Sequence, residues 1–238
     1  MSYKLSKSKI NAYLQCPRKF RYVYVNKIET EENEHFKKGK DIHNIAEDFI
    51  NIWKKDNSID FLETLYELES KYEDDYKDHC QNLAEFFKEK LTCEGYGVFS
   101  TEEYIISEKY NFSGKSDLVL EKDGKLTVID YKTGKSSSVQ DYVTELCYYK
   151  MLVEDKNHEK NVEYAAIFFT KDGGYSELMF TDAEYSAINC SLTEYNNKLD
   201  LIEEVREKIE AGEFPPKRQY LCKYCDFKDL CDKEGFIE

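Results

Sequence analysis

The sequence predicts an α/β fold in which a mixed central sheet is flanked by helices, and it places all 238 residues in a single domain. Helical spacing of apolar residues dominates residues 1–92, whereas short apolar runs separated by turn residues dominate residues 93–181. Helical spacing returns in residues 182–238, which end in a cysteine-containing tail. With 41% hydrophobic residues and only 3 Pro and 10 Gly, the chain has the composition of a globular protein. This order of elements is typical of a sheet covered by helices.

The N-terminal part is expected to be mostly helical. Ser6 is a good N-cap for a short helix that stops at Cys16-Pro17. Apolar residues then recur at intervals of three and four from Phe36 to about Lys55, so this segment is predicted to form a helix that carries His43.

The middle of the chain is expected to form the sheet. Ser116 to Leu120 and Leu126 to Tyr131 are apolar runs separated by Lys122-Asp-Gly-Lys125, a pattern typical of a β-hairpin. The same patterns predict further helices at residues 59–91, 139–153 and 182–211, and further strands at residues 104–106, 162–170 and 175–180.

The charge is distributed unevenly. A formal net charge of -14 excludes a protein that coats nucleic acid indiscriminately, because phosphate binding relies on Lys and Arg. Residues 1–28 nevertheless contain no acid, and this stretch is either a surface for a phosphate backbone or a solvated helix face. Its seven basic residues are Lys4, Lys7, Lys9, Arg18, Lys19, Arg21 and Lys27.

The N-terminus lacks the apolar core of a signal peptide, and no stretch is apolar enough to span a membrane. We therefore expect a cytoplasmic protein without a membrane partner. Its eight cysteines are then expected to be reduced thiols or metal ligands rather than disulfides.

Asp117 and Asp130 form an acidic pair at the predicted hairpin. The first stands near the start of one strand and the second near the end of its partner, so pairing brings their carboxylates together. Such oxygens are the ligands that Mg²⁺ or Mn²⁺ prefers. Lys132 lies two residues beyond Asp130 and therefore faces the same side of the strand. Taken alone, Asp-x-Lys is equally typical of a salt bridge at a strand end.

Cys222-x2-Cys225-x5-Cys231 lies in a polar tail that is too short to bury a core of its own. Chelation of a metal or cluster is the usual way to order such a tail, and Cys16 is the candidate fourth ligand that would join the two ends of the chain. The four remaining thiols belong to no motif and are expected to be buried: Cys80, Cys93, Cys147 and Cys190.

Taken together, these motifs resemble the PD-(D/E)xK nuclease superfamily, and within it the RecB and AddB nuclease domains and the CRISPR-associated adaptation exonucleases that carry an iron-sulfur cluster. The residues that carry the resemblance are Gly39-x-x-x-His43-x-x-x-Glu47, Gly114-x-x-Asp117, Asp130-Tyr-Lys132-Thr-Gly134, Glu145 to Tyr149, and Cys16-Pro17-Arg18-Lys-Phe20 with Cys222, Cys225 and Cys231.

The resemblance implies a restriction-endonuclease-like fold and a metal-dependent DNA exonuclease acting on single strands or DNA ends. It implies that Mg²⁺ or Mn²⁺ is held by His43, Asp117, Asp130 and the main-chain carbonyl of Tyr131, and that Lys132 is catalytic. Three acids are possible accessory residues: Glu47, Glu108 and Glu145. Of these, Glu47 shares a helical face with His43. In the family the position of Glu145 is usually Gln, followed after three residues by Tyr, here Tyr149.

The resemblance also implies that the four cysteines Cys16, Cys222, Cys225 and Cys231 hold a [4Fe–4S] cluster, which would pin the basic N-terminal helix and the tail over the cleft. The residues expected to contact DNA are Lys7, Lys9, Arg18, Lys19, Arg21 and Tyr149. DNA repair or recombination, CRISPR adaptation and phage DNA processing are the pathways implied. The sequence encodes no nucleotide-driven motor, so the chain either works alone or has a helicase or an integration complex as its partner.

Two other functions stay open at this point. The chain is also compatible with a non-catalytic module that binds DNA ends or assembles a complex while it keeps the fold and the cluster. A third reading is an interaction protein whose tail is held by zinc, because zinc is also bound by four cysteines.

Overall fold

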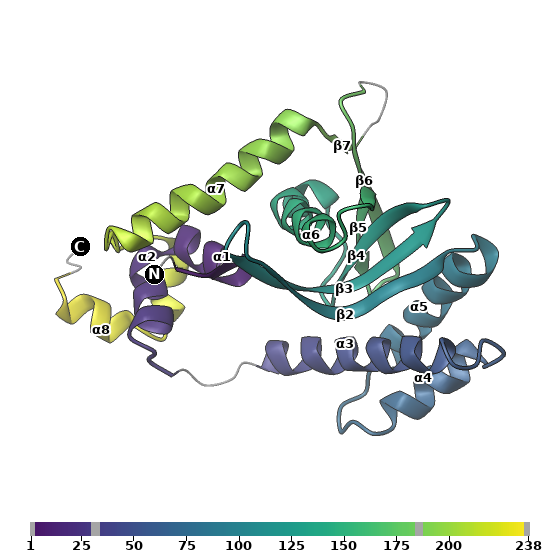
Figure 1. Ribbon diagram of the computed structural model, residues 1–238. Helices are drawn as coiled ribbons and strands as arrows, with labels where there is room; N and C mark the ends of the chain where they lie inside the picture. Colours follow the sequence, from purple (N-terminus) through teal and green to yellow (C-terminus); the bar gives the residue numbers. More distant parts are fainter. Residues whose placement is uncertain (1–2, 30–33, 184–187, 236–238) are drawn as a thin grey trace.

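The computed structural model describes residues 3–29, 34–183 and 188–235, with only the backbone of Glu34 and His35. It confirms the predicted fold class: a curled sheet of mixed strand directions lies between two layers of helices (Figure 1). The sheet has seven strands: β1 (Leu5–Ser6), β2 (Gly97–Ser107), β3 (Phe112–Lys122), β4 (Lys125–Lys132), β5 (Asn161–Phe169), β6 (Gly174–Phe180) and β7 (Asn189–Cys190).

Strand β3 is the centre of the functional region because it has three partners. Antiparallel β2 pairs with it over almost its whole length and occupies one of its two edges. The other edge must therefore be shared by β1, which pairs in parallel at Phe112 and Ser113, and by β4, which pairs from Leu118 onwards. Residues 114–117 lie between these two pairings. Asp117 is thus inside β3 rather than at its start, which corrects the prediction from the sequence.

The predicted hairpin between β3 and β4 is confirmed. Asp123 and Gly124 have φ angles of 53° and 77°, the left-handed conformations that a two-residue turn requires, and Asp-Gly is a favoured pair for it. The register pairs Leu118 with Ile129, so the next residues, Asp117 and Asp130, extend side by side beyond the last pairing.

Helices cover the sheet on both faces (Figure 1). Three of them, with the inner side chains of the sheet, bury one apolar core: α3 (Glu34–Trp53), α4 (Phe61–Glu69) and α5 (Lys77–Phe87), which continues as a π-helix (Lys88–Cys93). The opposite core is buried by α1 (Lys7–Gln15), α2 (Pro17–Phe20), α6 (Val143–Lys156) and α7 (Leu192–Glu210). Smaller elements are a π-helix (Arg21–Val25), 3-10 helices (Val139–Tyr142 and Tyr220–Tyr224) and α8 (Lys228–Lys233).

Two helical predictions were too long. Residues 59–91 contain two α-helices rather than one, because residues 70–76 form a non-helical connection between α4 and α5. The terminal helix begins at Leu192 rather than at residue 182: Ser191 caps it by accepting from the backbone N–H of Glu194, and β7 precedes it. Residues 184–187 of that prediction lie outside the described residues.

The N-terminal segment is fixed against the body of the protein. The side chain of Arg206, which is 6% exposed, donates to the backbone carbonyls of Tyr3, Tyr110 and Asn111 at 3.3, 2.6 and 3.3 Å. One buried guanidinium therefore holds the strand β1 beside the start of β3. The two terminal regions of the chain also lie on the same side of the molecule (Figure 1), where Arg21 pairs with Glu234.

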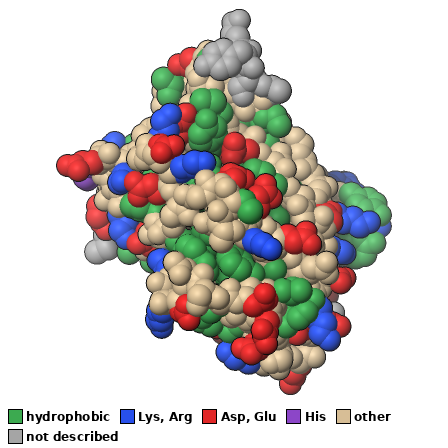
Figure 2. Space-filling model, turned by 90° about the vertical axis from the view of Figure 1, so that its right-hand side faces the viewer, with side chains coloured by type: hydrophobic (Ala, Val, Ile, Leu, Met, Phe, Trp, Pro, Cys, Tyr) green, Lys and Arg blue, Asp and Glu red, His purple; other side chains and the backbone are tan. Residues whose placement is uncertain are grey.

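Acidic and basic side chains are interspersed over the face drawn in Figure 2, as expected for a chain with 48 acidic and 34 basic residues. Within the described residues, no helix combines the length and the apolar character that crossing a membrane requires.

Candidate active site

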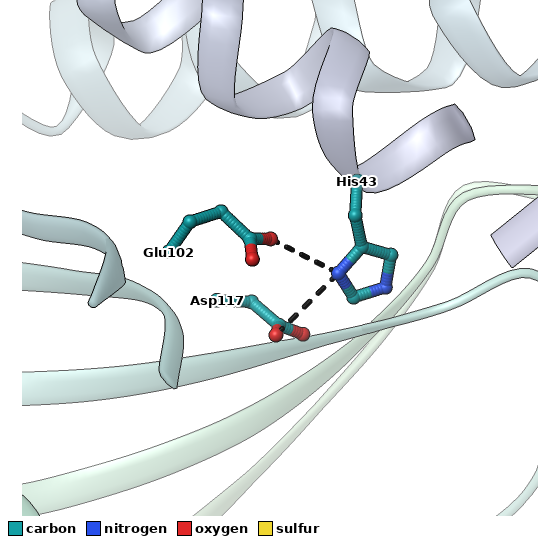
Figure 3. A group of neighbouring side chains, drawn as sticks. All are labelled: His43, Glu102 and Asp117. Atoms are coloured by element: carbon teal, nitrogen blue, oxygen red, sulfur yellow. Dashed lines mark hydrogen bonds and ion pairs between the residues drawn. The ribbon is translucent and has the colours of Figure 1, made fainter. Parts of the chain in front are cut away.

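His43, Glu102 and Asp117 form a compact group with their ligand atoms within 4.8 Å of one another. The Nδ1 of His43 lies 3.0 Å from the Oε1 of Glu102 and 3.5 Å from the Oδ1 of Asp117, and its other ring nitrogen points away from both carboxylates (Figure 3). One imidazole and two carboxylates at this spacing can hold a divalent cation, because all three offer lone pairs of the kind that Mn²⁺ or Mg²⁺ accepts.

Three different elements bring these side chains together. His43 projects from α3, and its ring packs edge-on against Tyr131 with centroids 5.6 Å apart. Glu102 lies between Thr101 and Glu103, which pair with residues 118 and 116 of β3, so it stands beside Asp117. The backbone of Glu102 adopts a φ of 46°, which is uncommon for a residue other than glycine.

Glu102 was not among the residues predicted from the sequence. It stands in the polar run Thr101-Glu-Glu-Tyr, where alternation alone gives no reason to choose it over Glu103. Its side chain is 3% exposed and also pairs with Lys115 at 2.5 Å. A buried carboxylate needs such partners. Glu108, by contrast, is 85% exposed and pairs with Lys4, so it does not join the group.

The two carboxylates favour the protonated form of His43. Burial lowers the pKa of His43, but the carboxylates of Asp117 and Glu102 outweigh it and raise the pKa to about 10. Burial, reinforced by the charge of Asp130, raises the pKa of Asp117 despite the opposing effect of His43. The imidazolium therefore stands as the counter-ion of the two carboxylates. Glu47, one helical turn beyond His43, contributes a negative charge near Lys115.

Asp130 and Lys132 occupy the adjoining side of the site. The Nζ of Lys132 lies 2.5 Å from the Oδ2 of Asp130 and 2.6 Å from the Oε1 of Glu145, which lies in the first turn of α6. Asp130 is 2% exposed, and its Oδ2 accepts no hydrogen bond of good geometry within the described part of the chain. This oxygen instead faces the ammonium of Lys132, so Asp130 is a buried, ion-paired carboxylate beside Asp117 that can serve as a ligand of a cation.

Lys7 enters the same site from the N-terminus. Its Nζ contacts Glu145, lies 3.8 Å from the Oδ1 of Asp130 and donates to the Tyr149 hydroxyl at 3.4 Å. Burial lowers the pKa of Lys7 to about 8, with Lys132 adding to this shift and Asp130 opposing it. Tyr149 is 6% exposed and is part of the core above the sheet.

The other residues predicted to contact DNA lie further along the N-terminal segment. Lys9 donates to the carbonyl of Lys4 at 2.8 Å, and Arg21 pairs with Glu234. Arg18 and Lys19, on α2 between them, line a cavity of about 500 Å³ that the two terminal regions form.

That cavity also brings together the four clustered cysteines, each of them half-buried with a free thiol. Its walls carry more basic than acidic side chains. The residues that matter here are Cys16, Arg18, Lys19, Lys217, Arg218, Cys222, Lys223, Cys225, Lys228, Cys231 and Asp232. Two guanidinium nitrogens of Arg18, Nε and Nη1, are buried with no hydrogen-bond partner among the described residues. An anionic group in the cavity would satisfy them.

The remaining thiols differ from their prediction in one case. Cys93 is exposed because it ends the π-helix after α5, whereas Cys80, Cys147 and Cys190 are buried. The sulfurs of Cys147 and Cys190 lie 3.8 Å apart and join α6 to β7.

The family model described as the PD-(D/E)XK nuclease superfamily matches residues 4–232, a span that includes the acidic site and all four clustered cysteines. No curated protein matches the sequence. The curled mixed sheet between helical layers agrees with a restriction-endonuclease-like fold. Because the match covers nearly the whole chain and the acidic site lies on the central strands, the protein belongs to the PD-(D/E)XK nuclease superfamily, which indicates a metal-dependent nuclease.

Proposed function

We propose that this protein is an exonuclease that hydrolyses phosphodiester bonds in DNA, at DNA ends or in single strands, with Mg²⁺ or Mn²⁺. The observation that carries the proposal is that two groups of side chains lie next to each other: His43 of α3, Glu102 of β2 and Asp117 of β3 form one group, and Asp130 and Lys132 of β4 form the other. Acidic metal ligands beside a lysine can supply both an activated water and the charge stabilisation that hydrolysis of a phosphodiester needs.

The proposed metal ligands are His43, Asp117, Asp130 and the main-chain carbonyl of Tyr131, with Glu102 as an additional ligand or as the partner that orients His43. The buried position of Asp130, next to Asp117 just beyond the last pairing of the hairpin, supports this assignment. A bound cation lowers the pKa of water and neutralises charge on the phosphate. Its binding would also displace the proton of His43, since a ligating imidazole must be neutral.

Lys132 is the proposed catalytic residue. Its side chain is 22% exposed and its ammonium is held between two carboxylates, so the ammonium has a fixed position while the side chain is not fully buried. An ammonium held in this way can orient the attacking water and stabilise the charge that develops on the phosphate oxygens.

The test compares Asp130→Asn and Lys132→Met with the wild type on 5′- and 3′-labelled single- and double-stranded DNA, with Mg²⁺ and with Mn²⁺. Both variants should lose at least about 100-fold in rate, because each removes a group that acts in the transition state. Lys125→Met is a matched control at the opposite end of β4, where its side chain is exposed and pairs with Glu163.

Mononucleotides released from one end would support an exonuclease, whereas internal fragments would assign endonuclease activity instead. Undiminished cleavage by both variants would contradict the proposed site. Binding of DNA ends without cleavage by the wild type would favour the non-catalytic module.

For the cysteine cavity we propose a [4Fe–4S] cluster. The four thiols, the excess of basic side chains and the unpartnered nitrogens of Arg18 support an anionic occupant. Zinc is less suitable, because a Zn–S distance of about 2.3 Å would require the sulfurs to lie about 3.8 Å apart. In the described residues, no three of these sulfurs come within 4.8 Å of one another. An iron-sulfur cube holds its cysteines further apart.

Protein purified without oxygen should be brown and contain about four irons per chain. Cys16→Ser and Cys225→Ser should lose the colour, and Cys93→Ser, at an exposed thiol outside the cavity, should keep it. A colourless wild type that contains zinc would contradict the proposal.

A single strand is the proposed substrate form. Tyr220 and Tyr224 beside the cavity are 75% and 70% exposed, and the ammonium of Lys223 lies over both rings. Exposed rings next to cations are typical of surfaces on which unpaired bases stack. A helicase or an integration complex remains the proposed source of such strands.

A further inference from the structure

We propose that Lys7 and Glu145 are a pair of positioning residues: Glu145 holds the ammonium of Lys132, and Lys7 cancels the charge of Glu145 so that a DNA phosphate can approach. This inference rests on the proposed nuclease function and adds two residues to its machinery.

The Oε1 of Glu145 is shared by two lysines. The Oε1 of Glu145 contacts the Nζ of Lys132 at 2.6 Å and also accepts from the Nζ of Lys7. Both lysines reach Asp130 as well, at 2.5 and 3.8 Å. Two ammonium groups and two carboxylates therefore alternate, and their formal charges cancel.

These four charged side chains are mostly buried and do not lie on the open surface. The side chain of Glu145 is 11% exposed and that of Asp130 is 3%, while the two lysines are 22% and 25% exposed. Ion pairs at such burial are screened less by water and salt than surface pairs. Removal of one cation leaves a carboxylate partly desolvated and unpaired.

The fold explains why Lys7 is the residue that arrives here. Strand β1 occupies the edge of β3 that β4 leaves free, and Lys7 follows β1 directly. Ser6 caps α1 and turns the chain at that point, and the buried Arg206 fixes the carbonyl of Tyr3 just before it. The ammonium therefore has a defined position although it comes from the N-terminal end of the chain.

Charge makes the pairing necessary. Glu145 lies next to the position where a phosphate must enter, and a lone carboxylate there would repel it. With Lys7 in place the local sum is neutral. Replacement of Lys7 by Met leaves one negative charge, and replacement of Glu145 by Gln as well restores neutrality while the amide oxygen still accepts from Lys132.

The experiment is a double-mutant cycle with Lys7→Met, Glu145→Gln and the combined variant, assayed for kcat and KM on single-stranded DNA. Lys7→Met should reduce kcat about 10-fold or more with little change in KM, because the unpaired Glu145 repels only the scissile phosphate while the rest of the bound strand keeps its contacts. The combined variant should recover to within about 3-fold of Glu145→Gln. Lys9→Met is the comparison for simple attraction of DNA: it removes a charge from the same helix, at a side chain that contacts Lys4 and the ring of Tyr3, so it should affect KM and leave kcat unchanged.

If Lys7 only attracts DNA, Lys7→Met and Lys9→Met will raise KM alike and kcat will be unchanged. Adding Glu145→Gln to Lys7→Met will then give no recovery, which overturns the proposal.

The wild type, the two single variants at Lys7 and Glu145 and the combined variant also give a thermal unfolding cycle without metal. There Lys7→Met should lower Tm and the combined variant should recover part of the loss. Strictly additive Tm changes overturn the pairing even if the wild type proves inactive, which separates this outcome from failure of the nuclease function. Lys7→Gln replaces Lys7→Met if the latter does not fold.

Discussion

The backbone N–H of Tyr131 donates a hydrogen bond of 2.8 Å to the Oδ2 of Asp117. This bond ties the end of β4 to the middle of β3 at the point where the regular pairing of the two strands has stopped. The other oxygen of Asp117, Oδ1, is the one that faces His43. A main-chain donor therefore orients the carboxylate, and the side chain of Tyr131 takes no part in that contact.

Tyr131→Phe should consequently leave nuclease activity within about 3-fold of the wild type. The hydroxyl is buried and has no hydrogen-bond partner among the described residues, so its loss should be neutral or should raise the free energy of unfolding by up to about 1 kcal/mol. Urea denaturation together with the cleavage assay measures both effects. A 100-fold loss of rate would mean that the phenol, not the carbonyl, serves the reaction.

Glu102→Gln should weaken Mn²⁺ binding by about 10- to 100-fold, whether Glu102 contacts the ion or orients His43. Titration calorimetry of the metal measures the change directly. Glu103→Gln is the control next in sequence, because its carboxylate is 29% exposed and pairs with Lys156 instead. Equal affinities of the two variants would remove Glu102 from the metal site.

Gly114→Ala should destabilise the protein by about 1 to 3 kcal/mol, because the added Cβ would lie 2.8 Å from the Cδ1 of Leu152 on α6. Leu152 is 1% exposed and has little room to move. Shortening it in the combined Gly114→Ala/Leu152→Val variant should recover part of the loss in chemical denaturation. Because α6 also carries Glu145, the single variant should lose activity with stability. A purely additive pair would show that the contact is not the cause.

His79 predicts a dependence of stability on pH. It is 4% exposed, its Nδ1 lies 2.8 Å from the Thr170 hydroxyl, and burial lowers its pKa to about 4. The unfolded chain takes up this proton near pH 6.5, so folding is penalised as the pH falls from 6.5 towards 4. Between pH 7 and pH 5 the wild type should lose about 1 to 2 kcal/mol more than His79→Gln does. Parallel losses in the two proteins would argue against a neutral buried imidazole.

The sequence by itself determined the local parts of this protein. The hairpin turn at Asp123-Gly124, the N-cap at Ser6 and the helix of His43 depend on backbone preferences and periodicity within a few residues, which any short stretch of sequence contains. The proximity of Asp117 and Asp130 followed from the hairpin, since its turn fixes which residues stand side by side.

Only the tertiary structure decided which distant residues complete the site. Glu102 stands beside Asp117 through the pairing of β2 with β3, and Lys7 reaches Glu145 across 138 positions because β1 occupies a free edge of β3. The basic lining of the cysteine cavity likewise combines residues from both ends of the chain. Such contacts leave no periodic trace in the sequence, because they depend on how whole elements pack and on which strand edges remain unpaired.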